Sequence, residues 1–133
     1  MQLTQRTDYS LMVLMYCASN TQRDNPITIM EILEQHQISK SHLTKIVSFL
    51  SNVGLLNTAR GRNGGISLAK PANQITVGTV IRLTESNFDV VECFNKKTNS
   101  CSITSSCKLK HALKSATNSF LTRLDQVTLQ EIC

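Results

Sequence analysis

The sequence predicts a mainly α-helical protein, in which a winged helix-turn-helix domain is followed by a long C-terminal helix. Apolar residues recur with a helical period in several segments, and two short strand-like stretches flank a glycine-rich basic tip. A block of residues from 35 to 84 also contains basic side chains but no carboxylate. The 133 residues are enough for one domain core with an appendage.

The first helix is expected over residues 4–19. Tyr9, Met12, Val13 and Tyr16 lie at positions i, i+3, i+4 and i+7, which is the period of a helix face. Further apolar residues widen this face, so we expect the helix to be buried on most sides.

A second and a third helix are expected to form a helix-turn-helix. Thr28 and Glu31 have the spacing of a capping box, which predicts a helix from there to about His36. Ser39 is the expected N-cap of the third helix, and Gly54 ends it. The inner face of the third helix has apolar residues at helical spacing, namely Leu43, Ile46, Val47 and Leu50.

The outer face of the third helix is small, polar and basic, which suits a recognition helix that enters the DNA major groove N-terminus first. The candidate DNA contacts on it are Lys40, Ser41, His42, Thr44, Lys45 and Ser48.

Residues 55–60 and 66–70 are expected to be the two strands of a hairpin. The tip reads G-R-N-G-G, and arginines there could meet phosphates or a narrow minor groove. The alternative, a phosphate-cradling nucleotide loop, is disfavoured because the Lys-Ser/Thr of a P-loop and a following helix are both absent. The candidate DNA contacts in this wing are Arg60, Arg62, Asn63 and Gly64.

Charge is distributed unevenly along the chain, whose formal net charge is +5. The block from 35 to 84 carries only basic charged residues: Lys40, Lys45, Arg60, Arg62, Lys70 and Arg82. A surface that serves only solubility would normally mix both signs, so we interpret this block as facing a polyanion.

Two further helices are expected, one from Thr76 to about Glu85 and a long one from Leu109 to about Asp125. The long helix carries an apolar stripe of Leu109, Ala112, Leu113, Ala116, Phe120, Leu124 and Val127. Packing of this stripe against its copy in a second subunit would bury it and predicts a homodimer; packing within one chain is the alternative.

Three of the five cysteines, Cys93, Cys101 and Cys107, have the spacing C-x7-C-x5-C in a polar, loop-like segment. An iron–sulfur cluster accepts such wide gaps, whereas zinc usually needs a closer pair and a disulfide would leave one thiol over. Three unrelated cysteines are the remaining alternative. Cys17, within the first helix, is expected to be a packed core thiol.

Three thiolates leave one iron of a four-iron cluster without a protein ligand. His111 would lie about one helical turn after Cys107 if the long helix has begun there, so it is a plausible fourth ligand. Asp8 by itself is explained by its place in the first turn of a helix, where a carboxylate favours the helix dipole.

Four motifs together resemble the IscR/NsrR family of winged-helix regulators, and within it the nitric-oxide-sensing repressors. They read M-Q-L-T-x-x-T-D-Y, I-S-K-S-H-L-T-K-I-V-S-F-L-S-N-V-G-L-L, A-R-G-R-N-G-G-I-S-L-A-K-P and C-S-I-T-S-S-C-K-L-K-H-A-L. The resemblance covers nearly the whole chain. It implies a homodimer that binds a palindromic double-stranded DNA operator, and an iron–sulfur cluster whose destruction by nitric oxide releases the DNA. The implied cluster is [4Fe–4S], with [2Fe–2S] as the alternative.

The resemblance also implies roles for particular residues. Cys93, Cys101 and Cys107 match the cluster cysteines, and Asp8 matches the acidic position that supplies the fourth ligand from the partner subunit. The gap between Cys93 and Cys101 is longer than is usual in the family. IscR-type members use a histidine three residues after the last cysteine, where this chain has Lys110.

We therefore expect a cytoplasmic transcriptional repressor rather than an enzyme, because no membrane-length apolar run and no Cys–His–acid pattern is present. Residues 1–86 would form the DNA-binding domain, 87–107 the cluster-binding loop, and 108–133 the dimerisation helix and tail. One alternative is a regulator of the IscR type that reports iron–sulfur or redox status. The other is a thiol-based redox enzyme, which would leave the basic block unused.

Overall fold

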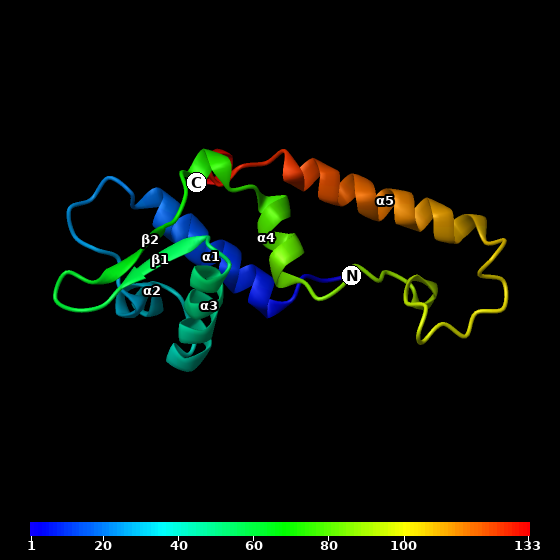
Figure 1. Ribbon diagram of the computed structural model, residues 1–133, viewed down its shortest axis with the longest axis horizontal. Coiled ribbons are helices and arrows are strands. Elements are labelled where there is room, and N and C mark those ends of the chain that lie inside the picture. The colour runs from blue at the N-terminus through cyan, green and yellow to red at the C-terminus, as the bar shows by residue number, and fades with distance from the viewer.

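The computed structural model describes all residues from 1 to 133 and confirms a mainly α-helical winged helix-turn-helix fold (Figure 1). The elements are α1 (Gln5–Ser19), α2 (Ile29–Gln35), α3 (Lys40–Asn52), β1 (Leu56–Ala59), β2 (Gly65–Leu68), the 3-10 turn η1 (Ala72–Gln74), α4 (Val77–Thr84), the 3-10 turn η2 (Glu92–Phe94), α5 (Lys108–Asp125) and α6 (Leu129–Ile132). The sequence did not predict the 3-10 turns or α6. No helix is both long and apolar enough to cross a membrane.

Hydroxyl side chains determine where four helices begin. Thr4, Thr28, Ser39 and Thr76 are the N-caps of α1, α2, α3 and α4, and each side chain accepts a hydrogen bond from the backbone N–H three residues later. Because the first N–H groups of a helix have no intrahelical partner, each of these bonds stabilises a helix start. The predicted starts at Thr28, Ser39 and Thr76 are confirmed, whereas the first helix, expected from residue 4, begins at Gln5 with Thr4 as its cap.

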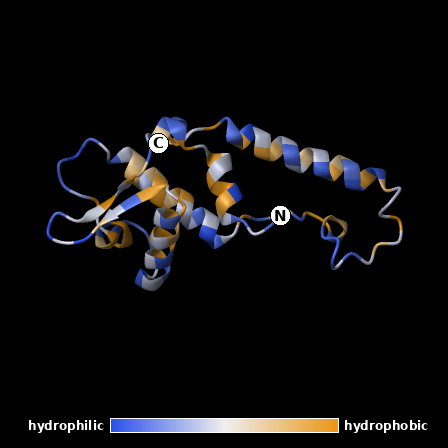
Figure 2. Cartoon of the chain, viewed as in Figure 1, coloured by the Kyte–Doolittle hydropathy of each residue, from blue (hydrophilic) through white to orange (hydrophobic).

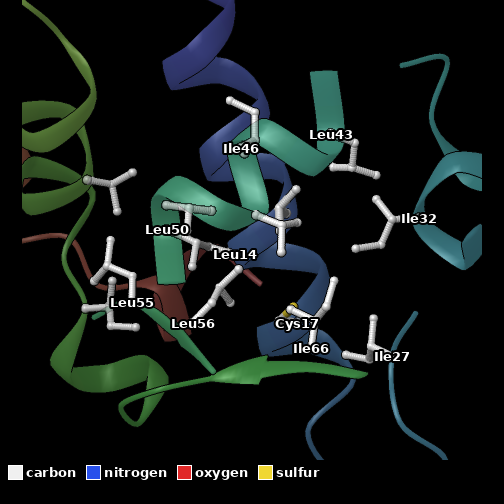
Figure 3. Packing of buried hydrophobic residues seen from close by; sticks show 14 of the residues in the cluster. Leu14, Cys17, Ile27, Ile32, Leu43, Ile46, Leu50, Leu55, Leu56 and Ile66 are labelled. Atoms are coloured by element: carbon white, nitrogen blue, oxygen red, sulfur yellow. The ribbon is translucent and has the colours of Figure 1, made fainter. Parts of the chain in front are cut away.

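The main core surrounds α1, which is covered by α3, by the wing and by the C-terminal segment (Figure 3). Leu14 of α1 and Leu43 and Leu50 of α3 are fully buried, and Leu129 of α6 joins the same cluster. Cys17 belongs to it as predicted, with only 1% of its surface exposed, and burial raises the pKa of its thiol to about 12. This thiol is therefore a neutral packing group.

The wing is an antiparallel hairpin in which Leu56 pairs with Leu68 and Ala59 with Gly65. Its strands are each shorter than the predicted 55–60 and 66–70. Ile66 is buried, and its N–H donates to the carbonyl of Ile27, with 2.8 Å between N and O. This bond attaches the wing to the segment that precedes α2, so the wing and the helix-turn-helix form one body.

Glu31 joins three segments around α2. Its carboxylate accepts hydrogen bonds from the Arg23 guanidinium (Nη2 to Oε2, 2.7 Å) and from the Tyr16 hydroxyl (2.5 Å). These donors, Arg23 first, lower the pKa of Glu31 to about 2. The capping box predicted at Thr28 is thus only half formed. The Thr28 hydroxyl caps the Glu31 N–H, but the Glu31 side chain turns toward α1 and Arg23 instead of returning to Thr28.

The C-terminal end of α5 is fixed to α4. The Val77 N–H donates to the Val127 carbonyl (2.8 Å), and Arg82 forms two hydrogen bonds with Asp125. Gly78 allows close approach, because a Cβ added there would lie 2.6 Å from the Asp125 backbone nitrogen. From this joint α5 runs away from the winged domain, and residues 85–107 return from its far end to the end of α4 (Figure 1).

Gly78→Ala should separate α4 from α5. The new methyl group overlaps the Asp125 backbone, and overpacking of this kind costs about 1–3 kcal/mol of unfolding free energy. Chemical denaturation followed by circular dichroism would measure this loss. Arg82→Ala is the control, because it removes the exposed ion pair at the same joint without a clash and should cost much less. Equal stability of Gly78→Ala and the wild type would show that the contact is not tight.

Glu31→Gln should change how stability depends on pH. The pKa of Glu31 in the folded protein is below its ordinary value of 4.5, so its stabilising contribution is present above pH 4.5 and is lost as the pH falls toward about 2. The melting temperature of the wild type should therefore fall more steeply across this window than that of Glu31→Gln. Glu34→Gln removes another carboxylate of α2 and should behave like the wild type; equal steepness in Glu31→Gln would contradict the role given to Glu31.

Candidate functional site

The predicted recognition residues lie on the open side of α3. Lys45 is exposed and points away from the core that Leu43 and Ile46 enter. His42 is half-buried, and its ring meets the ring of Tyr9 edge-on, with 5.0 Å between the centroids. The remaining predicted contacts of this helix are all exposed: Lys40, Ser41, Thr44 and Ser48. The helix therefore presents a small, polar and basic surface with a packed helix behind it.

The wing presents a second basic surface. Arg60, Arg62 and Asn63 are exposed, and Gly64 is half-buried close to the backbone of Ala59. Gly61 has φ +100, a conformation that favours glycine and allows the chain to reverse at the tip. In Figure 1 this tip and the start of α3 both project from the winged domain away from α5.

None of the predicted DNA-contacting cations is engaged in an ion pair. The two ion pairs of the structure are Arg23–Glu31 and Arg82–Asp125. Arg82 is the one basic residue of the carboxylate-free block that has an acidic partner, and it lies on α4 at the joint with α5. It therefore does not contribute a free charge to the predicted DNA face, which consists of α3 and the wing.

The three cysteines of residues 93–107 are half-buried and free. Cys93 lies in η2, and Cys107 is the N-cap of α5, where its Sγ accepts a hydrogen bond from the Lys110 N–H at 3.4 Å. The Cys107 thiol thus lies at the N-terminus of α5, with a backbone N–H pointing toward it. No three histidine, cysteine or acidic side chains lie close enough together in the single chain to hold a metal ion.

The hydrogen bonds of the segment around these cysteines are all local. Every hydrogen bond made by residues 91–107 goes to another residue between 91 and 110, as in the bonds from the Thr104 hydroxyl to the Cys101 carbonyl (2.8 Å) and from the Cys101 N–H to Asn99 (3.0 Å). Its donor chemistry, three free thiols, suits a sulfur-bound iron site. The single chain does not assemble that site, so binding would require movement of the segment or a second subunit.

The two candidate fourth ligands lie apart from each other. Asp8 is exposed in the first turn of α1, and His111 is exposed on the polar face of α5. Neither joins a cysteine in a possible metal site within the single chain. Both positions face outward, so either side chain is available to a second subunit.

Glu85 holds the turn that carries Asp8, a role that sequence reasoning missed. Its Oε1 accepts hydrogen bonds from the Thr4 N–H (2.8 Å) and the Thr7 hydroxyl (2.5 Å). Burial raises the pKa of Glu85, but the bonds from Thr7 and Thr4 outweigh burial and lower it. No sequence pattern indicated this link, because 78 residues separate Thr7 from Glu85. The start of the cysteine-bearing segment is thus tied to the first turn of α1.

Hydrophobic residues recur along α5 (Figure 2), and much of its apolar stripe is exposed. Leu109 is 64% exposed and Phe120 is 38% exposed, whereas Leu124 and Val127 pack near α4. The one buried residue of α5 is Leu121, which the predicted stripe did not include. Packing within one chain therefore covers only the end of the stripe near the joint.

Comparisons with known proteins agree with this architecture. The Rrf2 family, described as iron-dependent transcriptional regulators, matches residues 3–133. The HTH-type transcriptional regulator NsrR of Bacillus licheniformis is 46% identical, over 99% of this chain and 92% of the relative. NsrR of Bacillus subtilis is 42% identical, over 99% and 90%. The crystal structure of oxidised CymR from Staphylococcus aureus has a TM-score of 0.76 at 26% identity, covering 99% of this chain and 95% of that one.

The fold, the family match and the near full-length similarity to NsrR proteins confirm the predicted resemblance, and the chain belongs to the Rrf2 family of iron-dependent transcriptional regulators.

Proposed function

We propose that this protein is a homodimeric transcriptional repressor that senses nitric oxide through an iron–sulfur cluster, and that loss of the cluster releases the operator. One observation carries the proposal: the segment that holds three free thiols joins the end of α4 to the far end of α5. A change of order in this segment can therefore alter how α5 sits relative to the DNA-binding domain. The names of the NsrR relatives and the description of the family support it.

In the DNA complex, α3 would enter the major groove with its N-terminus first. Lys45, His42 and Ser41 would reach base edges from the open side of the helix. Arg60 and Arg62 would contact phosphates or the adjacent minor groove from the wing. If two copies bind together, the operator should be palindromic, because the two-fold symmetry of a dimer is matched by two equivalent half-sites in the DNA.

The homodimer is supported by the exposed stripe on α5. Water contact along Leu109 and Phe120 is unfavourable, and packing against a second copy would remove it. The joint at Gly78 and Asp125 attaches one end of each α5 to its own α4. Contact between two such helices would therefore set the distance and angle between the two recognition helices.

The proposed ligands are Cys93, Cys101 and Cys107, with Asp8 of the partner subunit as the fourth. When bound, an iron–sulfur cluster, most simply [4Fe–4S], supplies iron that a small diatomic such as nitric oxide can bind. A carboxylate is a hard and weak ligand for sulfur-bound iron, so Asp8 would leave one iron exchangeable. Since the single chain brings no complete ligand set together, a ligand from a second subunit is consistent with the structure.

The cysteine segment can act as a switch because little else holds it. Its hydrogen bonds are local, and a bound cluster would replace the missing long-range contacts. Glu85, at its start, bonds to the first turn of α1. Ordering of the segment would therefore affect both the end of α4 and the start of α1.

The decisive test begins with anaerobic purification, an absorption spectrum and counts of iron and sulfide per chain. DNA fragments selected by the protein from fragmented genomic DNA are then titrated before and after exposure to nitric oxide or to oxygen. Cluster loss and DNA release with nitric oxide support the proposal. A response to oxygen or iron supply alone would favour an IscR-type regulator, and full DNA affinity of the cluster-free protein would exclude the switch.

Variants of the DNA face should separate backbone contacts from base readout. Arg60→Ala and Arg62→Ala should each weaken binding and reduce the slope of log affinity against log salt by about 1, as expected when one phosphate contact is lost. Lys45→Ala should instead alter sequence preference. It should reduce the difference in binding free energy between the preferred DNA sequence and other sequences by about 1–3 kcal/mol. Arg123→Ala on α5 is the charge-matched control. Unchanged binding in all three variants at physiological salt would show that the assigned face is wrong.

Variants of the proposed ligands should identify the fourth one. Each of Cys93, Cys101 and Cys107 changed to Ser should lose iron and sulfide yet stay folded. Asp8→Ala should keep the three thiolates but change the absorption spectrum and the reaction with nitric oxide, whereas His111→Ala should resemble the wild type. The opposite pattern for Asp8 and His111 would assign the fourth ligand to His111 and favour the IscR-type function.

A further inference from the structure

Arg6 is a basic residue outside the carboxylate-free block, yet it lies beside the recognition helix. It is the second residue of α1, and its Cζ atom is 3.8 Å from the centroid of the Phe49 ring, which belongs to α3. A guanidinium over an aromatic ring is held by a cation–π interaction, so the position of this flexible side chain is restricted.

The first two turns of α1 run along one flank of α3. Tyr9 meets His42 edge-on, and Arg6 covers Phe49, seven residues further along α3. Lys45 is three residues after His42 and four before Phe49, so it lies on the same flank. The positively charged surface formed by Lys45 on α3 therefore continues onto α1 at Arg6.

The charge of Arg6 has no partner within the chain. It takes part in neither ion pair and in no hydrogen bond of the structure, although a guanidinium has five N–H donors. It also lies in the first turn of a helix, where the dipole disfavours positive charge. An anion outside the chain would satisfy these donors and offset the unfavourable position.

We propose that Arg6 contacts a DNA backbone phosphate beside the groove that α3 enters, with Phe49 acting as the platform that holds its guanidinium. This inference rests on the proposed DNA-binding function and adds α1 to the surface formed by α3 and the wing. Phosphate is the favoured ligand because an arginine fork matches its oxygens, and because the neighbouring free charge, Lys45, is also positive. A carboxylate of a second subunit is the competing ligand.

The test uses the full-length protein and a mixed-sequence DNA duplex, because a phosphate contact contributes to binding of any sequence. Arg6→Ala should weaken binding and reduce the salt slope by about 1. Arg6→Lys should keep the slope but bind less tightly, because an ammonium lacks the planar fork. Phe49→Leu should weaken binding about two- to fivefold with the slope retained, because the charge stays while its platform is lost.

Two controls keep failure of this inference distinct from failure of the proposed function. Arg62→Ala reports on the wing and should lower affinity whether or not Arg6 contacts DNA, and Arg123→Ala removes the same charge from α5, which lies away from α3 (Figure 1). If Arg62→Ala loses affinity while Arg6→Ala binds like the wild type, the Arg6 contact is wrong and the DNA-binding function stands. If Arg6→Ala instead shifts the protein from dimer to monomer in sedimentation experiments and leaves the salt slope unchanged, Arg6 serves the subunit interface and the inference is overturned.

Discussion

Burial of α1 is the constraint on which the rest of the structure depends. Val13, Leu14 and Cys17 are buried in the main core, and α1 contacts α3, α4, α6 and strand β2 of the wing. Full burial of a side chain such as Leu14 contributes about 1.5–3 kcal/mol, and no other helix touches as many elements. The position of the recognition helix and the path of the C-terminal segment both follow from this packing.

The same helix carries groups with different tasks at its two ends. Near its C-terminal end, Tyr16 reaches Glu31 and aligns α2. In the first turn at its N-terminal end, Asp8 is exposed to solvent and the Arg6 guanidinium lies over the Phe49 ring. Glu85 accepts a hydrogen bond from the start of this turn. The helix α1 thus contacts both the proposed DNA-facing surface and the start of the cysteine-bearing segment.

Two parts of the chain lack packing or bonding partners in a single copy, and both lie on the side of the molecule opposite the wing. The stripe on α5 is exposed beyond the joint at Gly78, and residues 91–107 make no hydrogen bond to the winged domain. Apolar exposure and a segment without long-range bonds are costly for an isolated monomer, and assembly with a second copy and a bound group would relieve both. We therefore propose that the subunit contact and the cluster act together.

The sequence by itself determined the local structure. Hydroxyl caps at Thr28, Ser39 and Thr76 and the helical period of apolar residues placed the helices, and the glycine-rich tip between two strand-like stretches indicated the wing, because these signals act over a few residues. The motifs were also enough to identify the family. Only the tertiary structure determined which charged side chains have a partner within the chain. It pairs Arg82 with Asp125, turns Glu31 away from its capping box, attaches Glu85 to Thr7, and places Arg6 on Phe49. These partners are far apart in the chain, and no local pattern encodes them; they follow from how the helices cross, which depends on the packing of the whole core.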